Sequence, residues 1–519
     1  MEVLVGLDAG TTATKAVSAG LDGRLRDTVS VSYALLVSRP GWAELDAAGL
    51  QAAAIEALRA VVGRVRERGD TVVGLSLSTA MHGLVPMARD GVPLGPLVTW
   101  ADGRAAAQAA ALVADGRAPG IHRDTGTPVH PMSPLVKLAW WAQHDPDLLA
   151  ATPRWGGVKE LLLSLLCGRP DVVDLSSASA SGMYDLVGRH WHVEAMEIAG
   201  VREGALPEVV PTTHLLPLLP DVAVAVGLPV GLPVVVGAAD GALANLGVGA
   251  VSGDVAAVSL GTSGALRVVV PRPTVDPAGR LFCYALTDDL WVLGGAVNNG
   301  GSVIRWAASA LAAPMDGLEP EGQDADDLDA ALLAEAASVP AGSQGLLCLP
   351  YLLGERAPWW RAGLRGAYLG LRRDHRRPHL VRAAVEGVCQ QLALVRDAFD
   401  VVGLPVREVR ATGGAVASPL WVQTLASALD LPVRRADSPE GTALGACLLG
   451  MHALGALPDL RQAAELVEVH APVEPVPEQA ALYRRLRPLV EQSALALTDV
   501  LSALDGVAPP LEGAGLKLL

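Results

Sequence analysis

The chain has 519 residues, which is too long for one ordinary domain and predicts two or three. Just over half of the residues (51%) are apolar, and the composition is that of a globular α/β protein with a full core in each domain. The formal net charge of −15 argues against a nucleic-acid partner and means that an anionic substrate would need a local basic group or a metal ion.

Short apolar segments and one long helix are predicted over the first part of the chain. Residues 3–7 are an apolar run ending at Asp8 and a glycine, which is the pattern of a buried strand. Strands over residues 17–19 and 28–33 follow, with a hairpin turn at Asp22-Gly23. The pattern then predicts a helix over residues 47–66 and a strand over residues 72–78.

A second unit of strand, turn and strand begins near the middle of the chain. Residues 255–260 and 265–270 are predicted strands, joined by a Gly-Thr-Ser-Gly turn. Because the opening hairpin has the same design, we expect two lobes of similar design. The N-terminal lobe is expected over residues 1–236 and the C-terminal lobe over residues 237–480.

The remaining segments are mostly helical. Residues 379–401 and 480–504 are predicted helices, the first of them strongly amphipathic. The acidic residues 315–329 are expected to form an exposed insertion. Residues 481–519 are expected to be a C-terminal helix with a loose tail from residue 505.

The segment DAGTTATK at residues 8–15 has the chemistry of a phosphate-binding turn. Gly10 permits a tight turn and close approach, while Thr11 and Thr12 add hydroxyl and N–H donors. Asp8 can hold Mg²⁺ through water. A plain hairpin turn with a capping aspartate is the alternative. No GxxxxGK[ST] string occurs, so a P-loop is excluded.

Two later turns have related properties. Gly261-Thr262-Ser263 is a second hydroxyl-rich turn, and one such loop from each lobe would clamp a triphosphate. A Gly413-Gly414 corner follows a predicted strand at residues 408–411, which suits a nucleotide lying against backbone. An ordinary turn and a packing turn are the respective alternatives.

Asp240 is the candidate general base. It follows a strand at residues 234–236 and stands among small residues, which leave room for a sugar hydroxyl to approach. The alternative is an N-cap for the helix that follows, and the spacing in the sequence does not distinguish the two interpretations.

Long strings of the sequence resemble the signatures of the FGGY family of carbohydrate kinases. The first is MSPLVKLAWW at residues 132–141, where Trp141 departs from the family's usual aliphatic residue or Phe, and the second runs from Gly366 to Glu386. Residues 349–351, 354–358 and 438–445 follow the family pattern as well, so the resemblance covers about residues 1–460. It implies an α/β protein with the two-lobed actin/hexokinase-like (ribonuclease H-like) ATPase fold, each lobe a mixed sheet flanked by helices.

The resemblance also implies roles for individual residues, with ATP and Mg²⁺ as cofactors. Asp240 matches the catalytic base, and Asp8 the residue that holds the metal through water. The residues that match the ATP-binding motifs are Asp8, Gly10, Thr11, Thr12, Lys15, Gly261, Thr262, Ser263, Gly413, Gly414, Ala443 and Gly445. The residues implied in substrate binding are Met81, His82, Trp100, Asp102, Arg104, His130, Asp240 and Asn298.

Within the family, residues 99–102, 125–134 and 296–301 resemble gluconate kinases more than xylulose kinases. The resemblance therefore implies phosphoryl transfer from ATP to D-gluconate, giving 6-phospho-D-gluconate and ADP. Xylulose kinase or another polyol kinase is the alternative. A non-catalytic sugar-binding sensor on the same fold is the alternative of another class.

A gluconate carboxylate needs local donors in so acidic a protein. The candidates are His82, Arg104, His130 and Lys159, of which arginine alone could bind it with two hydrogen bonds. Arg104 could instead pair with Asp102, and Lys159 could be a solvated surface charge.

The five cysteines are widely spaced and form no CxxC pair, which predicts buried reduced thiols and no zinc site. The N-terminus lacks the basic region of a signal peptide, and prolines and aspartates interrupt the most apolar stretch, at residues 215–251. We therefore expect a cytoplasmic protein without membrane or nucleic-acid partners, acting on a small sugar acid or polyol. A homodimer is one expectation for its oligomeric state.

Overall fold

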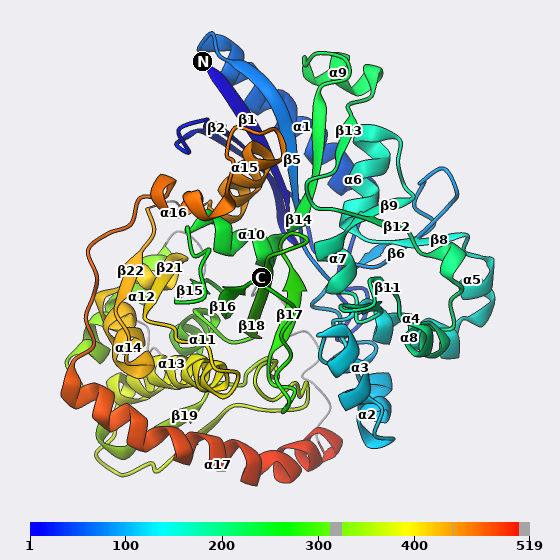
Figure 1. The fold of residues 1–519 in the computed structure, drawn as a ribbon. Coiled ribbons are helices and arrows are strands. Elements are labelled where there is room, and N and C mark those ends of the chain that lie inside the picture. The colour runs from blue at the N-terminus through cyan, green and yellow to red at the C-terminus, as the bar shows by residue number, and fades with distance from the viewer. Residues whose placement is uncertain (312–323, 438–439, 508–519) are drawn as a thin grey trace. The chain divides into compact units, whose positions relative to one another are not determined.

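A computed structural model describes residues 1–311, 324–437 and 440–507 (Figure 1). The chain divides into two compact units, each made of three segments. Unit 1 comprises Met1–Ser252, Val268–Leu293 and Glu440–Glu468. Unit 2 comprises Gly253–Arg267, Gly294–Pro439 and Val469–Leu519, as far as these are described.

A six-stranded mixed sheet forms the centre of unit 1, in the order β13-β14-β5-β1-β2-β3. Strands β1, β2 and β3 are antiparallel neighbours, whereas β5 is parallel to both β1 and β14. The predicted opening strands and the strand at residues 72–78 are thus confirmed. The bounds are β1 Glu2–Ala9, β2 Ala13–Gly20, β3 Leu25–Ser32, β5 Thr71–Thr79, β13 Leu215–Pro217 and β14 Pro233–Ala239.

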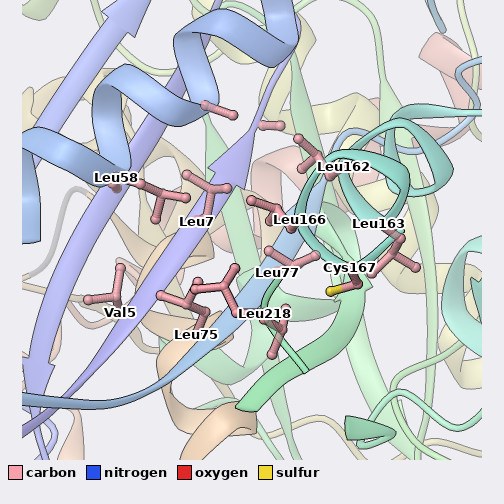
Figure 2. Packing of buried hydrophobic residues seen from close by; sticks show 14 of the residues in the cluster. Val5, Leu7, Leu58, Leu75, Leu77, Leu162, Leu163, Leu166, Cys167 and Leu218 are labelled. Carbon is pink, nitrogen blue, oxygen red and sulfur yellow. The ribbon is translucent and has the colours of Figure 1, made fainter. Parts of the chain in front are cut away.

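Helices α1 (Ala47–Glu67) and α6 (Val158–Cys167) cover one face of this sheet. The side chain of Asp46 accepts hydrogen bonds from the first turn of α1, which fixes where the helix begins. Figure 2 shows Leu58 of α1 and Leu162 of α6 in one buried cluster with Leu7 of β1 and Leu77 of β5. Because strand side chains alternate, residues 3, 5, 7 and 9 of β1 share this face and residues 4, 6 and 8 share the other.

Helix α15 (Gly441–Ala453) lies against the other face of the sheet, although it is distant in sequence. A Cβ atom on Gly6 would lie 2.5 Å from the carbonyl oxygen of Ala443. Helix α10 (Asp240–Gly247) packs as closely on α15, since a Cβ on Gly247 would lie 1.6 Å from the carbonyl oxygen of Gly441. Glycine is required at these contacts because any side chain would overlap backbone.

The other elements of unit 1 are short. The helical ones are α2 Ala106–Ala114, α3 Ala118–Thr125, α4 Pro134–His144, α5 Pro146–Ala151, α7 Leu175–Ser179, α8 Val193–Ala199, η1 Glu203–Ala205, α9 Pro220–Val226, η4 Leu460–Gln462 and α16 Ala463–Leu466. The strands are β4 Glu44–Leu45, β6 Val85–Met87, β7 Leu97–Val98, β8 Arg154–Gly156, β9 Val172–Asp174, β10 Tyr184–Asp185, β11 His190–Trp191 and β12 Glu208–Val210.

The second six-stranded sheet has the order β17-β18-β16-β15-β21-β22, and β15, β21 and β22 are parallel. Its strands are β15 Val255–Leu260, β16 Gly264–Val270, β17 Phe282–Ala285, β18 Trp291–Val297, β21 Glu408–Thr412 and β22 Val433–Arg435. Strand β17 of this sheet belongs to unit 1. Unit 2 holds β19 Leu347–Leu349, β20 Ala367–Leu369, α11 Ser302–Leu311, α12 Asp324–Ala337, η2 Ser343–Gly345, α13 Arg377–Val401, η3 Gly414–Ala417, α14 Pro419–Leu429 and α17 Pro477–Val507. The predicted strands at residues 255–260, 265–270 and 408–411 and the helices at 379–401 and 480–504 are confirmed.

The expectation of an exposed acidic insertion at residues 315–329 is not met where the structure describes it. Residues 315–323 lie outside the described residues. Residues 324–329 begin helix α12, which packs on α13, and Leu328 is 2% exposed. The prediction was wrong there because the acidic run continues into a helix whose Leu328, Leu332 and Ala336 are buried. Most of the expected tail, residues 508–519, also lies outside the described residues.

All five cysteines are buried and free, as predicted. Burial raises the pKa of the Cys447 thiol to about 12, so it stays protonated. Within the described ranges, no helix is long and apolar enough to cross a membrane.

Candidate active site

Asp8 and Asp240 lie at the same edge of the unit 1 sheet. Asp8 pairs in register with Ser78 of β5, and Ala239 of β14 pairs with the next residue of β5, Thr79. Because β1, β5 and β14 are parallel, their carboxyl ends meet at one edge, and Asp240 directly follows β14. The structure therefore brings the predicted metal-shell residue and the predicted base together.

The carboxyl group of Asp8 has a raised pKa of about 6. Burial is the main cause, and the nearby negative charges of Asp240 and Glu440 add to it. A 2.6 Å hydrogen bond from the Ser78 hydroxyl and the charge of Lys15 act in the opposite direction. The site thus holds negative charge that the surrounding protein only partly offsets.

Asp240 is the first residue of helix α10, after the N-cap position at Ala239. Its carboxylate accepts a 2.7 Å hydrogen bond from the backbone N–H of Gly241, and the side chain is half-buried. Asp240 is therefore not the N-cap that was considered as the alternative. A carboxylate at this position has the chemistry that a general base needs.

The loop between β1 and β2 turns tightly at Gly10. The N–H of Gly10 donates to the carbonyl of Ala13, and the hydroxyl of Tyr33 donates a 2.6 Å hydrogen bond to the carbonyl of Gly10. Thr12 is exposed at the tip, whereas Lys15 forms a 2.8 Å ion pair with Glu440. The loop is thus fixed at its base and keeps donors at its tip.

Trp100, a predicted substrate residue, is linked to this loop. Its indole N–H donates a 2.9 Å hydrogen bond to the hydroxyl of Thr11. The element expected to line the sugar and the loop expected to hold phosphate therefore share a direct contact inside unit 1.

Arg104 lies at the centre of a buried cluster and is only 3% exposed. Its guanidinium donates two 2.8 Å hydrogen bonds to Asp102 and a 2.6 Å bond to Glu44, and its carbon lies 3.6 Å from the Trp42 ring centroid. The Asp102 pairing that was considered as the alternative is present. Arg104 thus already binds two carboxylates of the protein itself.

Met81, His82 and Gly83 follow β5 and line a pocket in unit 1 with about 550 Å³ of empty space, part of it open to solvent. His82 has a backbone φ of 66°, and its Nδ1 lies 2.9 Å from the carbonyl of Ala180. The ammonium of Lys137 donates a 2.6 Å hydrogen bond to the carbonyl of His82. Lys137 therefore holds the backbone of a residue in an uncommon conformation.

His130 is 7% exposed, and its Nδ1 accepts a hydrogen bond from the N–H of Met132 at 3.3 Å. This contact lies one residue before Ser133, whose hydroxyl caps helix α4. His130 thus belongs to the same turn as the first family signature.

In unit 2, the second hydroxyl-rich turn is attached to the end of β18. The N–H of Gly301 donates 2.7 Å to the carbonyl of Gly261, and the N–H of Gly300 donates 3.0 Å to that of Thr262. Thr262 is exposed, as a phosphate-binding turn requires. Gly413 has a φ of 106°, and a Cβ there would lie 2.4 Å from the carbonyl of Leu260. The structure thus brings the Gly413-Gly414 corner beside this turn.

The buried carboxylate of Glu355 holds the end of β18, a role that was not predicted from the sequence. It accepts hydrogen bonds from the N–H of Asn298 at 2.6 Å and from the side chain of Asn299 at 3.1 Å. Burial raises the pKa of Glu355 to about 7. Asn298 is therefore placed by its backbone, and its side-chain amide donates to the carbonyl of Leu353.

Ala443 and Gly445 belong to unit 1, whereas Gly413 and Gly414 belong to unit 2. Ala443 is 1% exposed, and a Cβ on Gly445 would lie 2.1 Å from the carbonyl of Leu243. In unit 1 both residues serve the close packing of α15.

Lys159 is not a surface charge, as one interpretation of the sequence had it. It is 1% exposed, and its ammonium lies 3.5 Å from the carboxylate of Asp174. The signal that could have shown this is the strongly apolar sequence around it, Trp155 to Leu163, in which a lysine has to be paired.

The carboxylate oxygens of Asp8 and Asp240 suit a magnesium ion whose other ligands are phosphate and water. Among the described residues no group of three or more His, Cys, Asp or Glu side chains could hold a metal by itself. Mg²⁺ usually keeps several waters and binds through one or two carboxylates and a substrate phosphate. Burial and nearby negative charges raise the pKa of Asp8, and such a cation would stabilise its ionised form.

Comparison with known proteins identifies the family of most of the chain. Residues 3–247 match the N-terminal domain of the FGGY family of carbohydrate kinases, and residues 256–454 match its C-terminal domain. The chain therefore belongs to the FGGY family of carbohydrate kinases. It is a sugar kinase, and the predicted actin/hexokinase-like ATPase fold is confirmed.

Individual relatives are similar over nearly their full length. A gluconokinase from Bacillus subtilis is 36% identical over 489 residues, which are 94% of this chain and 94% of that protein. The crystal structure of a gluconate kinase from Lactobacillus acidophilus has a TM-score of 0.89 at 32% identity, covering 97% of this chain and 99% of its own. A ligand-bound xylulose kinase from the same species has a TM-score of 0.89 at 32% identity, covering 97% of this chain and 100% of its own.

Proposed function

We propose that this protein transfers the γ-phosphoryl group of MgATP to O6 of D-gluconate. The observation that carries the choice of acceptor is the 36% identity to a gluconokinase over 94% of both chains. The strings at residues 99–102, 125–134 and 296–301 support the same choice.

The proposed mechanism assigns each step to groups at the edge of the unit 1 sheet. Asp240 orients the acceptor hydroxyl and takes its proton as the oxygen attacks phosphorus, and the γ-phosphoryl bond to ADP breaks. The hydroxyl and N–H groups of Thr11 and Thr12 hold phosphate oxygens. A magnesium ion, held through water by Asp8, would supply positive charge to the phosphates. Positioning and charge stabilisation then carry most of the rate enhancement.

The second candidate is phosphorylation of D-xylulose. It is favoured by the ligand-bound xylulose kinase of Lactobacillus acidophilus, whose structure matches this chain as well as that of the gluconate kinase. The same Asp240 and phosphate loops would serve either acceptor, because both present a primary hydroxyl.

A coupled assay for ADP release with a panel of acceptors tests the proposal. The panel contains D-gluconate, D-xylulose, glycerol and D-glucitol, which differs from gluconate by a CH₂OH group in place of the carboxylate. We expect turnover of D-gluconate with a kcat/KM at least about tenfold above that of D-glucitol, since a charge-recognising site loses roughly 1.4 kcal/mol or more without its partner. Turnover of xylulose without turnover of gluconate would reject the proposed acceptor, and sugar binding without ATP consumption would reject the kinase reaction itself.

A further inference from the structure

We propose that Lys159 is a positioning residue for Asp240, acting through the backbone at the end of strand β14. The proposal rests on the role of Asp240 as the general base in the proposed function. It concerns unit 1 alone, because Lys159, β5, β14 and Asp240 all belong to it.

Strand β14 is irregular just before Asp240. Its register with β5 shifts between Val235 and Ala238, so that Val235 pairs with Ser76 but Ala238 pairs with Ser78. Gly237 in this bulge has a φ of 78°, and a Cβ there would lie 1.7 Å from the carbonyl oxygen of Leu77. A bulge interrupts the regular ladder of hydrogen bonds between strands, so the backbone here needs other partners.

The N–H groups of Val236 and Gly237 bond to the carbonyls of His214 and Thr212, and the ammonium of Lys159 binds carbonyl groups. It donates a 2.6 Å hydrogen bond to the carbonyl of Val236 and longer bonds of 3.4 Å to Ala238 and 3.5 Å to Leu77. The Lys159 ammonium thus bridges β5 and β14 across the bulge. It also contacts the carbonyl of Ala238, which lies two residues before Asp240.

Two polar residues next to Lys159 complete the arrangement. Asp174 lies 3.5 Å from the ammonium and at the same time caps helix α7, since it accepts from the N–H and the hydroxyl of Ser177. The hydroxyl oxygen of Ser176, in the first turn of α7, accepts a 3.3 Å hydrogen bond from the N–H of Ala239. The residue immediately before Asp240 is therefore held by the same helix whose cap pairs with Lys159.

The energetics favour a role beyond stability. The side chains of Lys159 and Asp174 are 1% and 0% exposed, so both charges lose their hydration. Well-packed apolar residues often stabilise a fold as much as such a buried pair. What an apolar side chain cannot do is donate to three carbonyls at once. The 2.6 Å bond to Val236, with the longer contacts to Ala238 and Leu77, restrains the backbone from which the Asp240 carboxylate projects, and catalytic geometry tolerates little displacement.

The test measures kcat and KM of Lys159→Met, Lys159→Arg and Ser176→Ala, with D-gluconate or, should the panel favour it, with D-xylulose. We expect Lys159→Met to lower kcat by about 30-fold or more and Ser176→Ala by about threefold to tenfold, since small misplacements of reacting groups cost about this much. The KM values for acceptor and MgATP should stay within about threefold, because the ammonium of Lys159, although the residue lines the pocket of Met81, His82 and Gly83, is taken up by three backbone carbonyls and Asp174. Lys159→Arg should restore part of the lost kcat.

Leu58→Ala is the matched control for lost stability, because Leu58 is fully buried in helix α1, in the apolar cluster that α1 and α6 form on one face of the sheet (Figure 2). It should lower the melting temperature while leaving kcat unchanged. A normal kcat in folded Lys159→Met, or an equal loss of kcat in Leu58→Ala, would overturn the proposal. If Lys159→Met does not fold, an unchanged kcat in Ser176→Ala decides against it. Normal turnover in Asp240→Asn would instead reject the proposed role of Asp240 itself.

Discussion

The hydroxyl of Ser78 donates a 2.6 Å hydrogen bond to the carboxylate of Asp8, between directly paired residues of two parallel strands. This bond lowers the pKa of Asp8, against burial and the charge of Asp240, which raise it. Burial thus remains the main cause of the raised pKa of Asp8, and the Ser78 hydroxyl on the neighbouring strand is the largest contribution that opposes it.

Ser78→Ala removes this bond, so we expect the pKa of Asp8 to rise above its present value of about 6. More of the enzyme would then carry a protonated Asp8 at mildly acidic pH. Activity relative to the unmodified enzyme should fall by roughly threefold or more at about pH 6.5 and by much less at about pH 8.5. The measurement is the pH dependence of kcat/KM for MgATP. Ser76→Ala is the matched control, since Ser76 is equally buried on the same strand. A parallel loss at both pH values would contradict the prediction.

Asp8→Asn should stabilise the unliganded protein at alkaline pH. The pKa of Asp8 is raised from 3.8 to about 6 on folding, so its contribution to stability is full below about pH 4 and is lost as the pH rises through about 6. At pH 8 the ionised group costs at most about 3 kcal/mol, at 1.36 kcal/mol per pKa unit. Urea unfolding at pH 5 and pH 8 would measure the difference.

The control for this variant is Asp90→Asn, because Asp90 is exposed in a turn and its side chain keeps its role as acceptor for the N–H of Val92. It should leave stability unchanged at both pH values. Asp8→Asn should also flatten the dependence of activity on Mg²⁺ concentration. An unchanged Mg²⁺ profile would remove Asp8 from the metal shell.

Asp240→Asn should keep nucleotide binding and lose turnover. The amide still accepts from the N–H of Gly241, so the local backbone is preserved, but it takes up no proton. We expect kcat to fall by about a hundredfold or more, the usual scale for a lost general base. Calorimetric titration with an ATP analogue, beside steady-state kinetics, separates the two effects. Near-normal turnover would show that another group takes the proton.

Much of this edge of the sheet could be predicted from the sequence. Periodicity located β1, β5 and β14, and an acid after each of two buried strands indicated where chemistry would lie. Sequence alone did not predict the neighbours of Asp8, because Ser78 is brought to it by strand register and Glu440 precedes a helix distant along the chain.

Buried charges were the hardest feature to interpret from the sequence. Lys159 was considered as a surface charge because exposed lysines are common, yet the irregular end of β14 and the neighbouring β5 give it three carbonyls to bind. A backbone bulge depends on pairing between strands far apart in sequence, and local patterns do not predict it. The contacts of Glu355 with Asn298 and Asn299 also join residues far apart in the sequence, so Glu355 was recognised only as part of a family string.

Arg104→Ala should unfold the protein at a much lower temperature without abolishing acceptor binding. Removing the guanidinium leaves Asp102, which is 0% exposed, and Glu44, which is 9% exposed, without their shared partner. Breaking such a buried cluster costs about 3–5 kcal/mol. We expect the KM for D-gluconate, measured well below the melting temperature, to change by less than about threefold. Normal stability with a KM raised tenfold would mean that Arg104 binds the substrate carboxylate instead.

The bond between Trp100 and Thr11 should couple acceptor binding to nucleotide binding. Trp100→Phe and Thr11→Val each remove the 2.9 Å bond while keeping most of the packing volume. We expect a bound non-hydrolysable ATP analogue to raise acceptor affinity less in either variant than in the unmodified enzyme. The coupling free energy should fall by about 0.5–1.5 kcal/mol, the usual value of one hydrogen bond. The double variant should lose no more than either single one, because all three lack the same bond. Trp359→Phe is the control, since its indole N–H donates a comparable 3.0 Å bond to Tyr351 in unit 2. Additive losses in the double variant would show that Trp100 and Thr11 act on their ligands independently.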